Sequence, residues 1–368
     1  MKKISLLHTE WSDGWGGQEI RILSESKELI KRGNSVIIAA QPNSQLLKKS
    51  REVGIPVLSL KMSKGLNIFA TYKLVRFIKE NQIDIVHTHS SVDSRVGGLA
   101  GRIARIPVVR SRHISIPVSQ SMFTWFQYMK LASKVITSGL FIKDTLVQEN
   151  NMIPDHIVSI PAGADEEKYC ADASLEDVRH KFGLDKNEFV IGMVSVLRSW
   201  KGHNYVIESM KHLVEQAPNI RLLIVGDGPK KDEIQTLIGK YQLEKHVTLA
   251  GHQSDPTPFY QAMDMVILPS YAGEATSQTL PQAMLMEKPV VSTDIGGLPE
   301  VVIHNKTGLV VPPQDSESIA SSILALYFNV DLRNKLAKQG REHALKYFTF
   351  GKMVDSTYNV YVDLLKER

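Results

Sequence analysis

Two cations in the second half of the chain suit the binding of a charged ligand. Arg198 and Lys201 follow the apolar run 190–194 and precede a helix pattern that begins at about His203. In open α/β sheets, ligands bind at the carboxyl ends of the strands, close to helix N-termini. An arginine fork and a lysine point charge there would hold a diphosphate and offset the charge on a departing nucleotide. The alternative is a pair of solvated cations in a loop.

A carboxylate and an amide, eight residues apart, follow a later apolar run. Glu274 falls in the loop after residues 265–268, and Gln282 falls in the helix pattern that comes next. A loop carboxylate can accept hydrogen bonds from sugar hydroxyls, and an amide can both donate to and accept from a ribose. These residue types favour a site for a sugar and a nucleoside.

Glycine-rich turns follow several apolar runs. Gly16 and Gly17 precede a helix pattern that starts at about Gln18, so backbone N–H groups there could approach an anion or a sugar closely. The spacing is not G-x-G-x-x-G, which makes a dinucleotide site a weak interpretation. The alternative is that the two glycines only permit a tight turn. Gly226 lies in a similar turn that, taken alone, is ordinary turn chemistry.

The elements that must position these residues are short apolar runs separated by helix-length segments. Such runs, without polar alternation and joined by crossovers, predict parallel sheets covered on both faces by helices. One series of runs comprises 4–7, 36–39, 83–87, 108–110, 135–137 and 157–160, and the other comprises 190–194, 221–225, 247–250, 265–268, 289–292 and 308–311. The predicted fold class is α/β, with two doubly wound domains in tandem.

A charged stretch with few large apolar residues, 166–188, separates the two series. We therefore expect an N-terminal Rossmann-like domain over residues 1–170 and a C-terminal one over 171–350. Residues 351–368 have apolar positions typical of an amphipathic helix that needs a partner surface. Packing of this helix back on the N-terminal domain is one option.

The composition excludes several classes of protein. One cysteine, Cys170, in 368 residues excludes a disulfide framework, and the sequence has neither a Cys/His cluster with metal-ligand spacing nor an Asp-x-Asp pair. The apolar stretch 4–7 is too short for a signal segment or a membrane span. We therefore expect a protein that needs no metal and works in the cytoplasm.

The charge is divided unevenly along the chain. Residues 1–165 hold 22 Lys and Arg against 13 Asp and Glu, whereas the rest of the chain holds 22 against 26. The basic half should face something anionic, such as the inner face of the cell membrane, unless its cations are only a solvated surface. The apolar stretch 114–129 would dock a membrane or a lipid-linked acceptor if exposed, and would otherwise pack as a helix on its own domain.

Taken in order, these segments resemble the retaining glycosyltransferases of family 4, the bacterial glycosyl transferases group 1, which adopt the GT-B fold. The resemblance covers nearly the whole chain and implies two Rossmann-like domains facing across a cleft that holds the donor. The segments that carry it are Gly16-Gly17-x-Glu19, 84–89, Arg112-His113, 161–165, 198–202, 226–229, the Glu274 loop, 288–291, 296–300 and 308–312.

The resemblance also implies roles for individual residues. It places the glycine loop near the donor phosphates and sugar, His113 near the transferred sugar, and the Arg198 and Lys201 pair on the diphosphate. It places Glu274 on the donor sugar. The backbone facing the donor phosphate would be that of Ala275, Thr276, Ser277, Gln278 and Thr279. From the residue type alone, His113 could equally be a buried, hydrogen-bonded side chain.

Two positions depart from the family pattern. The family's Glu-x7-Glu ends here in Gln282, an amide that can still donate to and accept from ribose hydroxyls. Many members place the arginine five or six residues before the lysine, whereas Arg198 precedes Lys201 by three. The diphosphate role therefore rests more on Lys201 than on Arg198.

The implied reaction moves a sugar from a UDP-sugar or GDP-sugar to a glycan or lipid-linked acceptor in cell-surface polysaccharide or lipopolysaccharide assembly. The nucleoside diphosphate would leave first, and the acceptor hydroxyl would attack from the same face, which retains the anomeric configuration without a metal. Two other functions stay open: a sugar-nucleotide 2-epimerase or hydrolase of the same fold, and a non-catalytic scaffold in glycan assembly. No nucleic-acid partner is expected.

Overall fold

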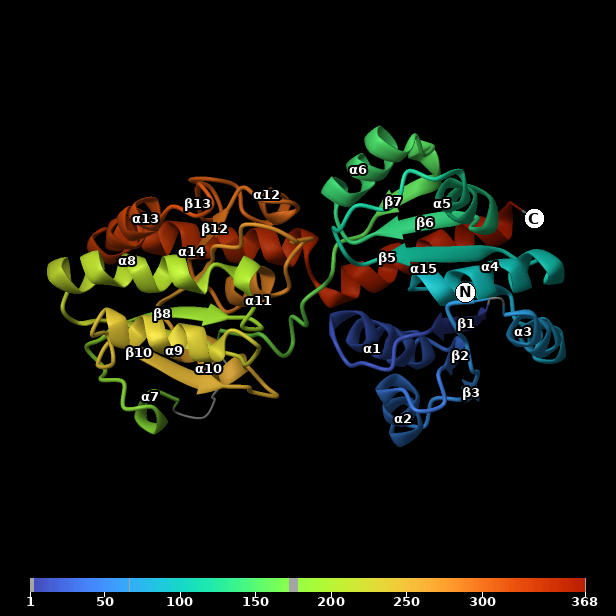
Figure 1. The fold of residues 1–368 in the computed structure, drawn as a ribbon, viewed down its shortest axis with the longest axis horizontal. Coiled ribbons are helices and arrows are strands. Elements are labelled where there is room, and N and C mark those ends of the chain that lie inside the picture. The colour runs from blue at the N-terminus through green and yellow to red at the C-terminus, as the bar shows by residue number, and fades with distance from the viewer. Residues whose placement is uncertain (1–2, 66, 172–177, 368) are drawn as a thin grey trace. The chain divides into compact units, whose positions relative to one another are not determined.

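The computed structural model describes residues 3–65, 67–171 and 178–367 (Figure 1). The chain divides into two compact units. Unit 1 comprises Met1–Pro161 and Met353–Arg368, and unit 2 comprises Ala162–Lys352. Part of the charged stretch expected as a linker, residues 172–177, lies outside the described residues.

Unit 1 is built on a seven-stranded sheet whose strand pairings are all parallel. In spatial order its strands are β3 (Val57–Ser59), β2 (Ser35–Ala40), β1 (Ser5–Glu10), β4 (Ile85–Thr88), β5 (Val108–Arg112), β6 (Lys134–Thr137) and β7 (Ile157–Ser159). The order reverses between β1 and β4, where open α/β sheets bind ligands. The register places His8 opposite His87 at this point.

Helices cover both faces of the unit 1 sheet. They are α1 (Gly17–Lys31), α2 (Gln45–Glu52), α3 (Ile68–Glu80), α4 (Ser91–Ala104), α5 (Met122–Phe126), the π-helical turn η1 (Gln127–Leu131), α6 (Leu140–Asn150) and the short turn η2 (Pro154–His156). Ile38 packs with residues of α1 and α2, whereas its neighbour Ala39 packs with residues of α3 and α4. Because successive strand side chains point to opposite faces, the two helix pairs cover opposite faces.

The C-terminal helix α15 (Phe350–Lys366) supplies a buried tyrosine to unit 1. The Tyr361 hydroxyl donates to Glu25 Oε1 at 2.9 Å and lies 2.6 Å from His87 Nδ1. Arg32 and Asp355 add an ion pair at 2.5 Å. The amphipathic pattern of this helix therefore faces α1 and β4.

Unit 2 is built on a six-stranded parallel sheet. In spatial order its strands are β10 (Val247–Gly251), β9 (Ile220–Val225), β8 (Phe189–Val194), β11 (Met265–Leu268), β12 (Val290–Thr293) and β13 (Leu309–Val311). Here the order reverses between β8 and β11. The second switch point therefore lies between the two strands that precede Lys201 and Glu274.

Unit 2 also buries both faces of its sheet under helices. They are α7 (Val178–Lys181), the short turn η3 (Ser199–Lys201), α8 (His203–Gln216), α9 (Lys231–Lys240), α10 (Thr257–Ala262), α11 (Thr279–Leu285), α12 (Leu298–Val301), α13 (Ser316–Phe328) and α14 (Val330–Tyr347). Ile191 packs with residues of α8, α9 and α13, and its neighbour Val190 packs with residues of α10, α11 and α12. Strands buried on both faces explain the continuous apolar runs.

The structure confirms the α/β class with two doubly wound parallel sheets. The strand that the apolar runs do not predict is β3, whose three residues are all half-buried. Each of the two alternatives for the apolar stretch 114–129 fits a part of it, because Met122 is exposed whereas Tyr128 is buried. Among the described residues, none of the helices combines the length and apolar character that a membrane span needs.

Candidate functional site

The carboxyl ends of β8 and β11 bring together two residues that the sequence singles out. Lys201 closes the turn η3 after β8, and Glu274 lies in the loop that follows β11. Lys201 Nζ lies 2.5 Å from Glu274 Oε1, although 73 residues separate the two in sequence. The strand order of unit 2 therefore places this ion pair at its switch point.

The Lys201–Glu274 pair is largely removed from solvent. The side chains are 18% and 6% exposed, respectively, and the Ser270 hydroxyl donates to the same Glu274 oxygen at 2.6 Å. Removing one partner of a buried pair leaves an uncompensated charge, which costs about 3–5 kcal/mol. Lys201 is therefore a fixed, paired cation and not a solvated loop residue.

Two glycines let neighbouring loops approach this pair. Gly202 has φ +78°, and a Cβ there would lie 2.1 Å from the Pro269 carbonyl oxygen. Gly296 has φ +59°, and a Cβ there would lie 2.2 Å from the carbonyl oxygen of Glu274. Both the left-handed backbone and the close approach require glycine. The turn around Gly296 thus supports the Glu274 loop from the β12 side.

Gly226 has a packing role in the structure. Its φ is +144°, and a Cβ would lie 1.9 Å from the Ser195 carbonyl oxygen. Gly228 likewise approaches the Leu197 backbone, with a Cβ distance of 2.7 Å to the carbonyl oxygen. These contacts hold the loop after β9 against the loop after β8. They account for Gly226 without a ligand, so its expected contact with the donor stays a prediction.

Arg198 lies apart from the ion pair. Its side chain is exposed, and its guanidinium carbon lies 5.0 Å from the centre of the Trp200 ring. Stacking on an aromatic face is a common use of arginine that leaves its N–H donors accessible. The structure therefore supports Lys201 as the fixed cation of the site and leaves Arg198 as a stacked, exposed one.

The segment between Glu274 and Gln282 is held by its polar side chains. Thr279 begins α11, and its hydroxyl donates to the Val194 carbonyl oxygen at 2.9 Å, while its N–H donates to Ser277 Oγ at 3.2 Å. The buried Tyr260 hydroxyl donates to Gln282 Oε1 at 3.0 Å. Residues 275–279 thus run along the carboxyl edge of the sheet. Ala275 and Gln278 are half-buried there, and Thr276 is buried.

The glycine turn of unit 1 leads directly into α1. Gly16 is the cap of this helix, and its N–H donates to Glu19 Oε2 at 2.8 Å. Glu19 therefore already places a carboxylate at the positive end of the helix. Gly17 faces open space, because a Cβ there would meet nothing within 4 Å. Of the two glycines, Gly17 is therefore the one whose backbone a ligand could approach.

Sequence reasoning missed a buried carboxyl group beside this turn. Glu10 ends β1 with no exposed surface, and its two oxygens accept from the Ser12 N–H at 2.7 Å and from the Gln18 side-chain amide. Burial, and then the nearby Asp93, raise the pKa of Glu10 to about 8. Glu10 therefore stays protonated at neutral pH and ties together both sides of the glycine turn.

His113 belongs to a cluster of histidines at the switch point of unit 1. Its Nε2 lies 3.1 Å from Nδ1 of His89, whose own Nε2 lies 2.8 Å from Nδ1 of His8. Burial lowers the pKa of His8 to about 3 and lowers the pKa of His89 and His113 well below the ordinary value. His113 is thus half-buried and hydrogen-bonded, and its expected contact with a sugar stays a prediction.

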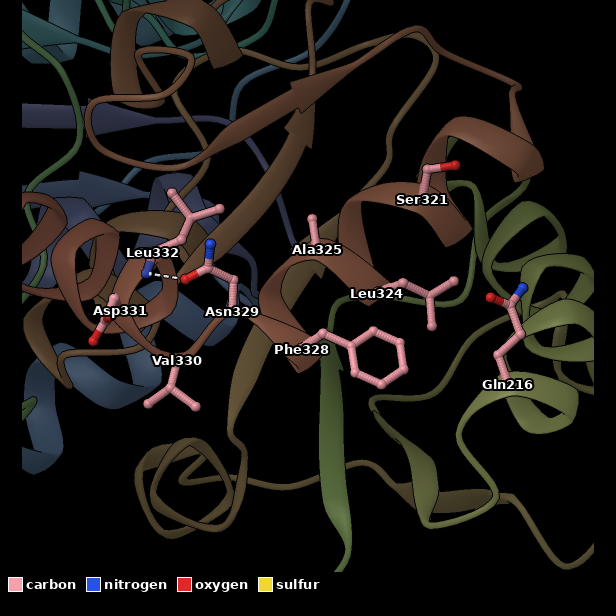
Figure 2. Close-up of a pocket in the computed structure, with 9 residues that line it drawn as sticks. All are labelled: Gln216, Ser321, Leu324, Ala325, Phe328, Asn329, Val330, Asp331 and Leu332. Carbon is pink, nitrogen blue, oxygen red and sulfur yellow. Dashed lines mark hydrogen bonds between the residues drawn. The ribbon is translucent and has the colours of Figure 1, made fainter.

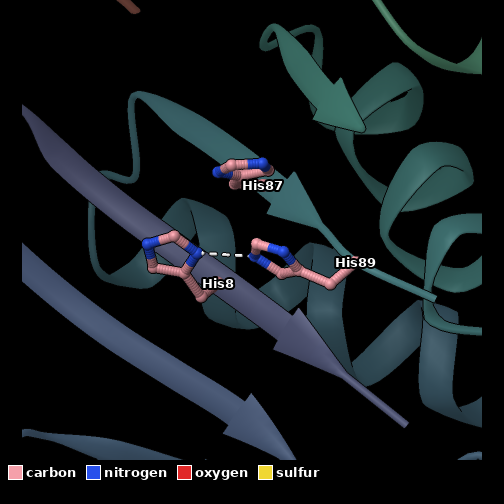
Figure 3. Close-up of side chains that lie close together, drawn as sticks. All are labelled: His8, His87 and His89. Carbon is pink, nitrogen blue, oxygen red and sulfur yellow. Dashed lines mark hydrogen bonds between the residues drawn. The ribbon is translucent and has the colours of Figure 1, made fainter. Parts of the chain in front are cut away.

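Three of these histidines gather ring nitrogens that could ligate a metal. In His8, His87 and His89, nitrogens lie within 4.8 Å of one another (Figure 3). Sequence spacing could not show this cluster, because His8 lies on β1 whereas His87 lies on the paired strand β4 and His89 directly follows it. His87 already bonds Tyr361 and Ser111. His8 bonds His89, as Figure 3 shows. The nitrogens therefore serve a hydrogen-bond network in this structure.

A hollow of about 700 Å³ lies elsewhere in unit 2 (Figure 2). It is lined by Gln216 at the end of α8 and by residues of α13 and the start of α14, including the exposed Phe328. None of the residues predicted to bind donor lines it. The hollow is therefore separate from the Lys201–Glu274 pair.

Family models match both halves of the chain. The model described as Glycosyltransferase Family 4 matches residues 15–168, and the one described as Glycosyl transferases group 1 matches residues 175–343. The chain belongs to the family 4, group 1 glycosyltransferases. It is therefore an enzyme of the glycosyl-transfer class, which confirms the family and activity that the sequence motifs predict.

Curated relatives of this glycosyltransferase match it over most of their length. The UDP-Gal:alpha-D-GlcNAc-diphosphoundecaprenol alpha-1,3-galactosyltransferase of Escherichia coli is 26% identical, over 84% of this chain and 83% of its own. The capsular polysaccharide biosynthesis glycosyltransferase CapM of Staphylococcus aureus is 24% identical, over 92% of each chain.

Solved structures share the fold of this glycosyltransferase. A glycosyltransferase from Rickettsia africae superposes with a TM-score of 0.91 over all of both chains at 23% identity. Anabaena Alr3699/HepE in complex with UDP gives 0.85 over 98% of this chain and all of its own, also at 23% identity. At such identities the likeness shows the fold alone, which is the expected GT-B fold with two Rossmann-like sheets.

Proposed function

We propose that this glycosyltransferase takes its sugar from a nucleoside diphosphate sugar and that unit 2 holds the donor. The Lys201–Glu274 pair at the switch point of β8 and β11 carries the proposal. A diphosphate would compete for Lys201, which would free the Glu274 carboxylate to accept from sugar hydroxyls. A relative named for UDP-Gal, and a fold neighbour in complex with UDP-glucose, favour UDP over GDP as the nucleotide.

The other predicted residues complete this proposed site. The backbone of residues 275–279 would face the donor phosphate. The Gln282 amide would donate to the ribose, while its oxygen accepts from the Tyr260 hydroxyl. Arg198 would place a second positive charge beside the diphosphate. From unit 1, the backbone at Gly17, where a Cβ would meet nothing within 4 Å, would bind the donor, and His113 would contact the transferred sugar.

We infer a retaining transfer that needs no metal. The bond from the anomeric carbon to the diphosphate breaks, and its electron pair passes to the phosphate oxygen. The acceptor oxygen bonds the anomeric carbon on the same face, and its hydroxyl proton passes to a phosphate oxygen of the leaving group. Lys201 offsets the developing charge, as a fixed cation in a site with little water can.

We also propose that the acceptor is a glycan or lipid-linked sugar and that unit 1 works on the anionic inner face of the membrane. The relatives act in capsule assembly and on a diphosphoundecaprenol acceptor, as their names state. Helix α3 supports the membrane contact, because Phe69 is 89% exposed and Tyr72 is 69% exposed. Residues 61–79 around them include five Lys and Arg and no Asp or Glu. Apolar side chains with flanking cations are typical of interfacial helices.

Calorimetric titration of UDP, GDP and ADP with a chelator present tests the donor site. We expect micromolar binding of UDP and a loss of at least about tenfold, or about 1.4 kcal/mol, in Lys201→Ala. Lys338→Ala, which removes an exposed lysine of α14, should bind like the wild type. Thermal unfolding without ligand shows whether Lys201→Ala is folded. Failure of the folded wild type to bind any of the three nucleotides would contradict the proposal.

Turnover assays separate transfer from the other reactions of this fold. With UDP-sugar, chelator and a lipid-linked acceptor, the product should keep the anomeric configuration of the donor, read by NMR coupling. An epimerase or a hydrolase would convert the donor without acceptor. Turnover that appears only when divalent metal is added would contradict the metal-free mechanism.

A further inference from the structure

Three imidazoles form a hydrogen-bonded line that ends at His113. His8 Nδ1 lies 2.8 Å from His89 Nε2, and His89 Nδ1 lies 3.1 Å from His113 Nε2. Because each neutral imidazole carries one N–H and one lone pair, the two bonds must run in the same direction. The position of the proton on the His8 ring therefore decides which nitrogen of His113 carries a proton.

Burial determines which nitrogen of His8, at the inner end of this line, carries the proton. His8 has no exposed surface, and its Nε2 is a buried atom without a hydrogen-bond partner. Burial keeps the ring neutral, because it lowers the pKa of His8 to about 3. A buried N–H without an acceptor is rarer in folded proteins than an acceptor without a donor. The proton of His8 therefore lies on Nδ1, which donates to His89.

The direction then passes along the line. His89 accepts at Nε2, so its own proton lies on Nδ1, which donates to His113 Nε2. We propose that His89 is a positioning residue that holds His113 as the Nδ1–H tautomer, so that His113 offers a substrate oxygen an N–H donor and not a lone pair. The proposal rests on the proposed function, in which His113 contacts the transferred sugar.

Neighbouring groups keep His89 in place and His113 neutral. The ring of His87 lies against His89, with centroids 4.3 Å apart, and both His87 nitrogens are held, by Tyr361 at 2.6 Å and Ser111 at 2.8 Å. After burial, the positive charges of Arg21 and Arg112 lower the pKa of His113 further. A neutral N–H donor suits a sugar hydroxyl or a phosphate oxygen and cannot act as a cationic acid.

Long-range ¹H–¹⁵N NMR of the full chain tests the tautomer directly and needs no variant. We expect the nitrogen pattern of a protonated Nδ1 and an unprotonated Nε2 for His8, His89 and His113. The opposite pattern at His113 in the folded wild type overturns the proposal. His113→Asn and His89→Asn spectra assign the resonances by loss of one ring each.

A matched pair of variants tests the positioning role. Asparagine at His89 keeps an N–H near the place of Nδ1 and can still donate to His113, whereas leucine cannot. We expect His89→Leu to mix the two tautomers of His113 and to lower kcat about tenfold, as loss of an orienting partner does in other sites. His89→Asn should keep the tautomer and stay within about threefold of wild type. Equal spectra and equal kcat in both folded variants overturn the proposal.

Kinetics of His113→Ala, read beside the wild-type spectrum, distinguish this inference from the proposed function. If His113→Ala leaves donor KM and kcat unchanged, His113 does not contact the sugar, and the proposed role of His113 fails whatever its tautomer. If His113→Ala loses activity while the wild type shows Nε2–H, the proposed role holds and the inference about His89 fails.

Discussion

One carboxyl group links the end of β1 to both sides of the glycine turn. Glu10 accepts from the Ser12 N–H and from the Gln18 side chain, and it faces Asp93 and Glu19. A negative charge on Glu10 would be buried and would lie near Asp93, and both conditions disfavour it. Burial, and then Asp93, therefore raise the pKa of Glu10 from 4.5 to about 8. The turn that should face the donor is therefore anchored by a neutral acid.

The raised pKa of Glu10 predicts how stability changes with pH. Between about pH 4.5 and 8 the folded chain keeps a proton on Glu10 that the unfolded chain releases, so this contribution is complete below pH 4.5 and is lost as pH rises to 8. The loss is on the order of 1.4 kcal/mol per pH unit within that window. We expect Glu10→Gln to gain stability relative to wild type as pH rises, measured by urea unfolding at pH 5, 6.5 and 8.

An exposed acid provides the control for this prediction. Glu52→Gln, on α2, should keep a constant difference from wild type across the same pH range. Wild-type and Glu10→Gln curves that run parallel from pH 5 to 8 would show that Glu10 is ionised in the folded state.

At the residue scale, the sequence correctly placed Lys201 and Glu274 at the carboxyl edge of a sheet, because each lies in the loop region that follows an apolar run. The structure adds that the two residues meet at the switch point, while their contact with a donor stays a prediction. Glu10 and His89 were missed, because each lies at the end of a strand where its partners come from other segments. His113 was found only through the family resemblance, and its bond to His89 needs the pairing of the strands.

At the element scale, glycines decide how close the loops come to the ion pair. The turn after β12 presses Gly296 against Glu274, where a Cβ would lie 2.2 Å from the carbonyl oxygen. A shift of the Glu274 backbone would move its carboxylate relative to Lys201 Nζ, which is 2.5 Å away. Activity should therefore depend on the backbone conformation of this turn.

Two glycine variants separate backbone strain from loop displacement. Gly296 (φ +59°) and Gly33 (φ +89°) are both left-handed, but a Cβ at Gly33 would meet nothing within 4 Å. Alanine should cost about 1–2 kcal/mol of unfolding free energy at Gly33, from the left-handed backbone alone. At Gly296 the cost should be larger, because the Cβ also clashes with the Glu274 carbonyl oxygen. We expect only Gly296→Ala to lower kcat/KM as well, by about tenfold or more, because misplacement by about 1 Å can cost a hundredfold. Equal kcat/KM in the two variants would show that the turn does not position Glu274.

The strands could be predicted from the sequence where both of their faces are buried. The apolar runs give strands such as β8 and β11 because a parallel strand between two helix layers needs apolar residues on both faces. β3 was missed because the strand has three residues, Val57–Ser59, which are only half-buried at the edge of the sheet.

At the scale of the whole molecule, the charge is divided between the two halves of the sequence. Residues 1–165 hold 22 Lys and Arg against 13 Asp and Glu. Helix α3 carries some of these cations and also exposes Phe69 and Tyr72 to water. Large apolar side chains at such exposure have a cost that contact with another apolar phase would remove. The charge was readable from the sequence, whereas the exposure of the α3 face required the fold.

Binding of the full chain to lipid vesicles tests whether these two features act together. We expect the chain to sediment with vesicles that contain an anionic lipid and hardly at all with neutral ones. Binding should weaken when salt rises from 0.1 to about 0.5 M, because added salt shortens the electrostatic screening length, which is about 10 Å at 0.1 M. The double variant Phe69→Ser with Tyr72→Ser should lower binding about tenfold at both salt concentrations, because an inserted apolar contact is not screened. Phe328→Ser, which removes an exposed aromatic of unit 2, should bind like the wild type. Salt dependence without any effect of the α3 variant would mean that the cations alone attract the chain, and equal binding to neutral and anionic vesicles would exclude the charge as the cause.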